Sequence, residues 1–333
     1  MRIIITGGGG FIGKKLALEL LRLGSITDAD GNPQNIREIV LADIMQPEGL
    51  PDDRRLTIRV GDFSGLHAIQ DLLRGGADLV FHLAAVVSGG AEEDFELGMN
   101  VNLHGSLHLL EALRAQQSAT GRCARLVFAS SVAVYGGDLP DVISDDLILN
   151  PQTSYGVQKA ATELLINDYS RRGFIDGRAL RLPTIVVRPG KPNKALSSFC
   201  SSIVREPLQG QDYVCPVNES TAMWVMSPRR VVEAFIHAAE LPAADWGSSR
   251  SVALPGITIT VREILQTLRE IGGENVVRRI RFEADPKVEK VVYGWAQKFQ
   301  PARGLALGFQ PDRDLRDIVQ AFIEDELGGD FVS

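Results

Sequence analysis

The chain has 333 residues, 44% of them hydrophobic, and a formal net charge of −7. This acidic balance, without a basic patch or an aromatic ladder, argues against nucleic acid as a partner. No apolar run is long enough to span a membrane, and the first residues already look like a folding strand, so we expect a cytoplasmic protein. The scattered Cys123, Cys200 and Cys215 lack Cys-x-x-Cys spacing, which also favours reduced thiols.

The amino terminus predicts a strand followed by a phosphate-binding loop and a helix. Arg2–Thr6 is a short β-branched run, and Lys14–Leu23 has leucines at helical spacing. Glycines between a strand and a helix let the backbone approach a pyrophosphate, which the N–H groups of the helix then bind. The loop residues expected to contact a dinucleotide are Gly7, Gly10, Phe11, Ile12 and Gly13.

Asp43 closes the next apolar run, and a carboxylate at this position accepts hydrogen bonds from the adenine ribose. It lies thirty residues past Gly13, where about twenty is usual. We attribute the excess to Gly24–Gln34, a polar stretch expected to form a surface loop. Because Ile44 rather than arginine follows Asp43, the sequence favours NAD over NADP.

Strand and helix patterns alternate as far as Pro189, which predicts an α/β fold with a doubly wound parallel sheet. We expect a cofactor-binding domain over 1–189 and a smaller lobe, mainly substrate-binding, over 190–333. The strands are expected at 2–6, 38–43, 56–60, 78–82, 125–130 and 178–187, and the lobe's helices near 229–240 and 260–271.

Ligands bind at the carboxyl ends of the strands in such sheets. Two strand ends therefore supply further cofactor contacts. Asp62 could bind the adenine amine, and small side chains would let the cofactor lie close. The residues expected to contact it from these ends are Asp62, Phe63, Leu83, Ala84 and Ala85.

Tyr155 and Lys159 are four residues apart at the head of a predicted helix, and Ser131 ends a strand upstream. Positions i and i+4 lie one above the other on a helix, so the ammonium can approach the phenol. A nearby cation favours the phenolate and lowers a tyrosine pKa of about 10 toward the working range. With a serine hydroxyl to hold the substrate oxygen, this set can move a proton on and off an alcohol.

These motifs stand in an order that resembles the extended short-chain dehydrogenase/reductase family, the group of nucleotide-sugar epimerases and dehydratases. The resemblance covers nearly the whole chain. It implies a Rossmann domain that binds NAD, a catalytic Ser131–Tyr155–Lys159 set and a homodimer formed through the helices that carry Asn102 and Tyr155. It further implies that Lys159 binds the nicotinamide ribose, that Asn102 helps to relay the proton, and that Ser130 and Pro183 lie near the cofactor.

Departures from the family pattern bear on the substrate. Thr184 and Ala222 stand where nucleotide-sugar members often carry an asparagine and an arginine for the diphosphate, while Arg188 and Lys191 add cations. The surrounding segments are similar to members that oxidise the 2-hydroxyl of a four-carbon sugar acid, D-erythronate. A nucleotide-sugar epimerase or dehydratase and a non-catalytic NAD-binding sensor stay open as alternatives.

We expect a small-molecule substrate, with Lys191 preferred as the carboxylate ligand. The candidate substrate residues are Ser88, Ser131, Thr184, Arg188, Lys191 and Arg229. His104 and His108 have the spacing of a metal pair, but the sequence offers no third ligand, so no metal site is expected.

Overall fold

The computed structural model describes residues 1–28, 31–190 and 197–332, which fall into two compact units. The first unit comprises Met1–Val134, Thr153–Arg181 and Val232–Ala253, and the second comprises Tyr135–Gln152, Leu182–Val231 and Leu254–Ser333. Each unit is therefore assembled from separated segments of the chain. That the first binds the cofactor and the second mainly the substrate stays a prediction.

A seven-stranded sheet in the order β13-β9-β7-β6-β1-β4-β5 forms the centre of the first unit, within the residues described. The pairings that join β5 to β4, β4 to β1, β1 to β6, β6 to β7 and β9 to β13 are all parallel. The doubly wound α/β fold is thus confirmed. The strands are β1 (Arg2–Thr6), β4 (Glu38–Asp43), β5 (Leu56–Val60), β6 (Leu79–His82), β7 (Ala124–Ser131), β9 (Ile175–Leu182) and β13 (Ser251–Ala253).

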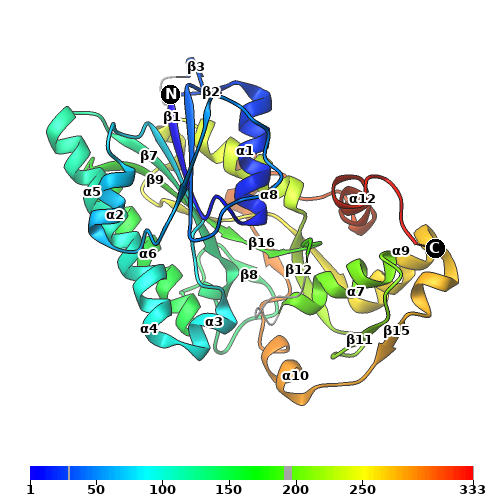
Figure 1. Ribbon diagram of the computed structural model, residues 1–333. Coiled ribbons are helices and arrows are strands. Elements are labelled where there is room, and N and C mark those ends of the chain that lie inside the picture. The colour runs from blue at the N-terminus through cyan, green and yellow to red at the C-terminus, as the bar shows by residue number, and fades with distance from the viewer. Residues whose placement is uncertain (29–30, 191–196, 333) are drawn as a thin grey trace. The chain divides into compact units, whose positions relative to one another are not determined.

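Helices cover both faces of this sheet (Figure 1). Central strands are buried on both faces, and Ile3, Ile4 and Ile5 of β1 are fully buried, as expected for a parallel sheet between two helical layers. In Figure 1, α1 and α8 lie on one side of the strands and α2, α5 and α6 on the other. The helices are α1 (Phe11–Leu23), α2 (Leu66–Leu72), α3 (Ser88–Glu93), α4 (Phe95–Gly98), the π-helix η1 (Met99–His104), α5 (Gly105–Thr120), α6 (Ser154–Arg171) and α8 (Pro228–Glu240), with short 3₁₀ turns η2 (Val132–Val134) and η3 (Ala243–Trp246).

Two sequence-based expectations need correction. The polar stretch Gly24–Gln34 contains a small antiparallel hairpin of β2 (Ser25–Thr27) and β3 (Pro33–Asn35) rather than a plain loop. The strand expected over 178–187 stops at Leu182, because Pro183 has no N–H to continue a ladder. Beyond it, β10 (Thr184–Ile185) belongs to another sheet.

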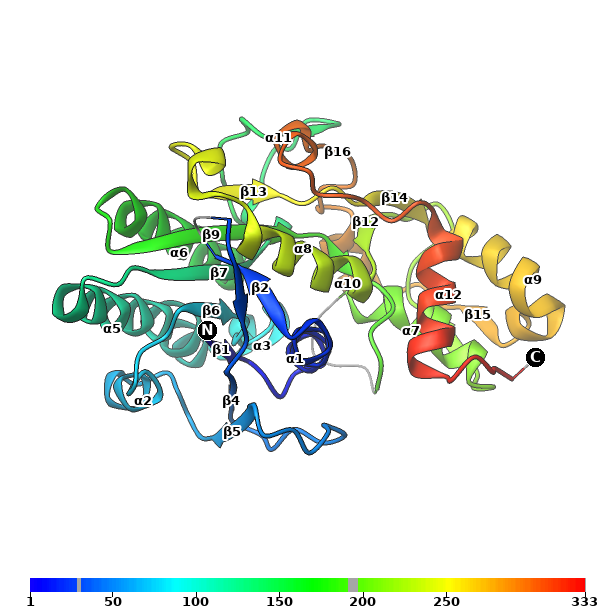
Figure 2. The same cartoon turned by 90° about the horizontal axis from the view of Figure 1, so that it is seen from above.

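The second unit contains a three-stranded sheet, β10-β12-β14, among the residues described. Figure 2 shows α7, α9 and α12 gathered in this unit, and their apolar side chains share one core with β12, among them Ile203, Ile264, Phe322 and Val225. Its remaining elements are β8 (Ile143–Ser144), α7 (Ser198–Leu208), β11 (Tyr213–Cys215), β12 (Ala222–Met226), β14 (Ile257–Thr260), α9 (Val261–Val277), β15 (Ile280–Phe282), α10 (Pro286–Val292), β16 (Phe299–Gln300), α11 (Ala302–Ala306) and α12 (Leu315–Glu326).

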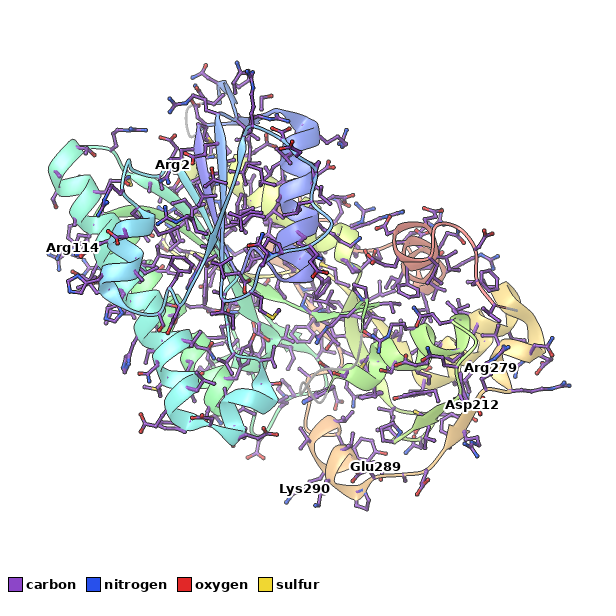
Figure 3. The ribbon with its side chains drawn as sticks, viewed as in Figure 1. Arg2, Arg114, Asp212, Arg279, Glu289 and Lys290 are labelled. Carbon is purple, nitrogen blue, oxygen red and sulfur yellow. The ribbon has the colours of Figure 1, made fainter. Side chains whose placement is uncertain are left out.

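Charged side chains differ in how they are placed. Arg114 on α5 and Lys290 on α10 project away from their helices (Figure 3). In contrast, Arg178 of β9 is fully buried and binds Asp176 at 2.6 Å. Burial lowers the pKa of Arg178 to about 10, although Asp176 opposes that shift.

Asp176 joins several arginines to the carboxyl end of α8. Besides Arg178, Arg250 lies 3.3 Å and Arg125 lies 3.6 Å from its carboxylate. Arg178 and Arg125 in turn donate to the backbone oxygens of Ala238 and Ala239 in the last turn of α8. The carboxylate therefore offsets part of the positive charge of the arginines that hold α8 against β7 and β9.

We expect Asp176→Ala to lower the free energy of unfolding by about 3–5 kcal/mol, since it leaves buried guanidinium groups without their counter-ion. Urea denaturation measures this. Asp168→Ala is the matched control, because its partner Arg171 is 69% exposed and such pairs contribute about 1 kcal/mol or less. Equal losses of unfolding free energy in the two variants would show that the buried network stabilises the protein no more than an exposed ion pair does.

Candidate active site

The glycine loop packs so tightly that side chains would not fit at two positions. A Cβ on Gly13 would lie 2.4 Å from the Gly7 backbone oxygen, and one on Gly7 would lie 2.7 Å from the Ala84 nitrogen. Gly7 also has a φ of +71°, which favours glycine. Helix α1 begins directly after this loop, and the first N–H groups of a helix have no intrahelical acceptor. The loop therefore offers a backbone site for a phosphate group.

Asp43 lies at the carboxyl end of β4, beside the glycine loop. Its carboxylate accepts hydrogen bonds from the Gly9 N–H at 2.9 Å and from the Met45 N–H at 3.1 Å. These bonds fix the orientation of the carboxylate, and each of its oxygens has a second lone pair for a ribose hydroxyl.

A pocket of about 390 Å³ opens at this edge of the sheet in the first unit. It includes eight residues that the sequence assigned to the cofactor, namely Gly7, Gly10, Asp43, Asp62, Phe63, Leu83, Ala84 and Ala85. Asp62 also accepts a bond from the Ser64 N–H, which lowers the pKa of its carboxyl. Glycine backbone, a ribose-binding acid and apolar walls together fit the adenosine and diphosphate of a dinucleotide.

Thr6 and His82 also line this pocket, and sequence reasoning gave neither a role. His82 Nδ1 lies 2.6 Å from Thr6 Oγ1, and its Nε2 lies 2.9 Å from Ser106 Oγ. Ser106 donates its own proton to the Asn102 carbonyl. His82 therefore donates through Nε2, and in the neutral form that its lowered pKa favours, Nδ1 accepts from Thr6. Burial, and secondarily Lys159, lowers its pKa to about 3.

Tyr155 and Lys159 lie in the first turns of α6, which Thr153 begins by accepting a bond from the Gly156 N–H. Lys159 is almost fully buried, and its Nζ lies 5.4 Å from the centre of the Tyr155 ring. The same Nζ donates to the Ala129 carbonyl at 2.8 Å, two residues before Ser131 in β7. The structure thus brings the ammonium to the tyrosine and to the strand end that carries the serine.

Burial lowers the pKa of Lys159 to about 7, an effect that Glu163 opposes. Ser131 Oγ accepts a bond from the Ala133 N–H at 3.1 Å. The neighbouring Ser130, expected near the cofactor, donates its hydroxyl to Glu163.

Asn102 lies in the π-helix η1, a rare helix type that is frequent at functional sites. Its amide bonds to both backbone groups of Val86, and its Nδ2 also donates to Gln158 Oε1 at 2.7 Å. Sequence reasoning missed Gln158, because its partner Asn102 lies on another element and the single sequence does not show that pairing. Asn102 therefore connects η1 to α6 and to the segment that precedes α3. The expected substrate residue Ser88 is the first residue of α3 and is half-buried.

The other expected substrate residues belong to the second unit. Arg188 donates through Nε to the Ile185 carbonyl and through Nη2 to Ser197 Oγ, both at 3.2 Å, beside the start of α7. Thr184 lies in β10, directly after Pro183. Lys191 lies outside the described residues.

Arg229 was expected to bind a substrate carboxylate, but the structure gives it protein partners. Its guanidinium lies 2.6 Å from Asp325 and 2.8 Å from Glu324. Hydrogen bonding to these carboxylates raises the pKa of Arg229. A guanidinium held by two acids is a weaker ligand for a third, so Arg188 becomes the better candidate among the described cations.

The two spaced histidines have other partners. His104 Nδ1 lies 3.3 Å from Asn100 Oδ1, and His108 Nδ1 lies 2.7 Å from the Ser64 carbonyl. Over residues 1–28, 31–190 and 197–332, no group of three potential ligands is arranged to hold a metal ion. Over the same ranges, no helix is both long and apolar enough to cross a membrane.

Residues 3–249 match the NAD dependent epimerase/dehydratase family. The chain belongs to this family. NAD is therefore its cofactor, and the pocket that joins the glycine loop to Asp43 fits that dinucleotide.

Several known proteins match this chain over nearly its full length. The chain is 48% identical to a D-erythronate dehydrogenase from Cupriavidus necator, over 98% of each chain. It is 41% identical to a D-erythronate dehydrogenase from Haemophilus influenzae, over 98% of this chain and all of that one. A crystal structure described as a nucleoside-diphosphate-sugar epimerase from Agrobacterium tumefaciens is 43% identical, with a TM-score of 0.93 over 99% of this chain and 95% of that chain.

The buried His82 should make the protein sensitive to acid. Its pKa is about 3 when folded and about 6.5 when unfolded, so only the unfolded chain takes up this proton between those values. Stability should therefore fall by about 1.4 kcal/mol per pH unit from this residue as the pH drops below 6.5. We expect His82→Gln to remove most of that slope in denaturant titrations from pH 6.5 to 4.5. An unchanged slope would mean that His82 is not buried in the neutral form.

Proposed function

We propose that this protein is an NAD-dependent dehydrogenase that oxidises the 2-hydroxyl of D-erythronate to 2-dehydro-D-erythronate. The observation that carries the proposal is the Tyr155–Lys159 pair of α6, whose lysine donates to β7, in a chain that matches two D-erythronate dehydrogenases over nearly its full length. The pair supplies alcohol chemistry, and the relatives supply the substrate class.

In this mechanism Tyr155 removes the hydroxyl proton of the substrate, and Ser131 Oγ orients the same oxygen. The Lys159 ammonium stabilises the phenolate form of Tyr155. NAD, which the glycine loop and Asp43 would hold, would supply the acceptor for the hydride of C2. The chain's further task is to hold both molecules within reacting distance, to which Asn102 contributes by fixing η1 against α6.

For the carboxylate of the sugar acid we propose Arg188, with Thr184, Ser88 and the sequence-predicted Lys191 as further ligands. Two side-chain bonds orient the Arg188 guanidinium near the amino end of α7, where the helix dipole also favours an anion. A small acid can be bound by one or two cations.

A nucleotide-sugar epimerase is the second candidate, because the Agrobacterium structure at 43% identity carries that description. An epimerase oxidises its substrate transiently and releases no NADH. Thr184 and Ala222 argue against it, since they stand where nucleotide-sugar members often carry an asparagine and an arginine that bind the diphosphate. The two candidates therefore differ in a measurable product.

The deciding experiment measures NADH release from purified protein with C4 to C6 sugar acids and with UDP- and dTDP-sugars. We expect release with D-erythronate or a close 2-hydroxy acid, and no shift in melting temperature with the nucleotide sugars. Tyr155→Phe should fold normally and lower kcat by about 10²–10⁴-fold, as expected for loss of a general base.

Within the same assay, Arg188→Gln should raise the KM for the acid far more than that for NAD, whereas Arg229→Gln should change neither greatly. Stabilisation by a UDP-sugar, with no NADH from any acid, would support the epimerase instead. NAD binding without any turnover would favour a sensor.

We also propose a cytoplasmic homodimer that forms through the helices that carry Asn102 and Tyr155, which are the continuous α4–η1 segment and α6. Large apolar side chains are exposed on these helices, with Leu164 at 70%, Phe95 at 57% and Val157 at 51%. Exposed apolar groups gathered in this way are typical of interaction surfaces.

Leu164→Glu should convert the dimer to a monomer in sedimentation velocity, because a carboxylate would have to be desolvated at the interface. Ile148→Glu is the control, since Ile148 is 85% exposed but belongs to neither helix. A wild-type monomer, or a dimer unaffected by Leu164→Glu, would contradict the proposed interface.

A further inference from the structure

Glu163 is a buried acid with no role in the chemistry described so far. It lies one turn after Lys159 on α6 and is 3% exposed. Arg181, at the carboxyl end of β9, binds it through two nitrogens, with Nη2 2.7 Å and Nε 3.1 Å from its oxygens. A buried carboxylate is costly unless it is paired and hydrogen-bonded, and Glu163 is both.

The Glu163 carboxylate and the Lys159 ammonium attach to adjacent residues of β7. Lys159 donates to the Ala129 carbonyl, and Ser130 donates its hydroxyl to Glu163. The next residue is Ser131. One turn of α6 thus holds the backbone that positions Ser131, and the charge of Glu163, one helical turn from Lys159, raises the pKa of that lysine.

Burial and the charge of Glu163 shift the pKa of Lys159 in opposite directions, and burial, which lowers it, has the larger effect. The charged and titratable groups that face the pair are Tyr155 on α6, His82 on β6 and Arg181 on β9. His82 is neutral, and Arg181 offsets part of the negative charge of Glu163.

We infer that Glu163 is a positioning residue, which keeps Lys159 in its ammonium form beside Tyr155 and fixes Ser131 through the hydroxyl of Ser130. This inference rests on the proposed dehydrogenase function. The competing explanation is that the Arg181–Glu163 pair only joins β9 to α6.

The pH dependence of kcat/KM separates these explanations. Oxidation needs the phenolate of Tyr155 and the cation of Lys159, so activity is lost at high pH as the lysine deprotonates. The apparent pKa of this alkaline limb belongs to Tyr155 and Lys159 as a coupled pair. Glu163→Gln removes the negative charge and should move the alkaline limb down by about one pH unit, a roughly tenfold loss on that limb. Arg181→Gln removes the opposing cation and should move the limb up.

Two variants provide matched controls. Glu163→Asp keeps the charge and should restore the wild-type limb, even where its kcat is reduced. Ser130→Ala leaves the charges unchanged and should lower kcat without moving the limb. Circular dichroism and melting temperatures establish that each variant is folded, and Arg181→Gln alone tests the sign if Glu163→Gln does not fold.

A second readout does not depend on any substrate. In protein with ¹³C-labelled lysine, the NMR titration of Lys159, assigned by its loss in Lys159→Met, should shift down in Glu163→Gln and up in Arg181→Gln. These shifts without turnover of any sugar acid would uphold the role of Glu163 while refuting the proposed function. If the variants turn over the substrate, and their alkaline limbs and Lys159 titrations coincide with those of the wild type, the inference is overturned. The Arg181–Glu163 pair would then be purely structural.

Discussion

The contact between the Lys159 ammonium and the Ala129 carbonyl is the constraint around which the first unit is arranged. An ammonium excluded from water needs acceptors and a compensating charge. Here the acceptor comes from β7 and the charge from the next turn of the same helix. The lysine, in turn, is placed to act on a tyrosine and a serine that are distant in sequence. The cost of burying a cation is thus offset by the groups that its chemistry requires.

The fold was predictable because its signals are local. The β-branched runs, the glycine loop and Asp43 each indicate an element by composition alone, and β1, β4 and β5 coincide with the expected ranges. The sequence pattern was insufficient to predict the structure where one stretch of residues is compatible with more than one element. Pro183 divides what looked like one long strand, and a polar stretch pairs with itself as a hairpin.

The site was predictable only in part, for a related reason. Tyr155 and Lys159 are neighbours on one helix, so spacing reveals them. His82, Gln158 and Glu163 act through partners on other elements, and a single sequence does not display those pairings. Arg229 illustrates the converse, because its charge suggested a ligand site until Asp325 and Glu324 were found beside it.

The interleaving of the two units has a consequence for synthesis of the chain. Strand β13 completes the sheet beside β9, yet residues 182–231 of the second unit are translated between them. Until residue 253 has left the ribosome, β9 is an open edge whose backbone groups can pair with another chain. Nascent molecules of this protein are therefore exposed to edge-to-edge association for the time needed to translate roughly seventy residues, about 4–14 s at common elongation rates. A chaperone that covers β9 during that interval would protect the yield of folded protein without binding to the surface of the folded protein.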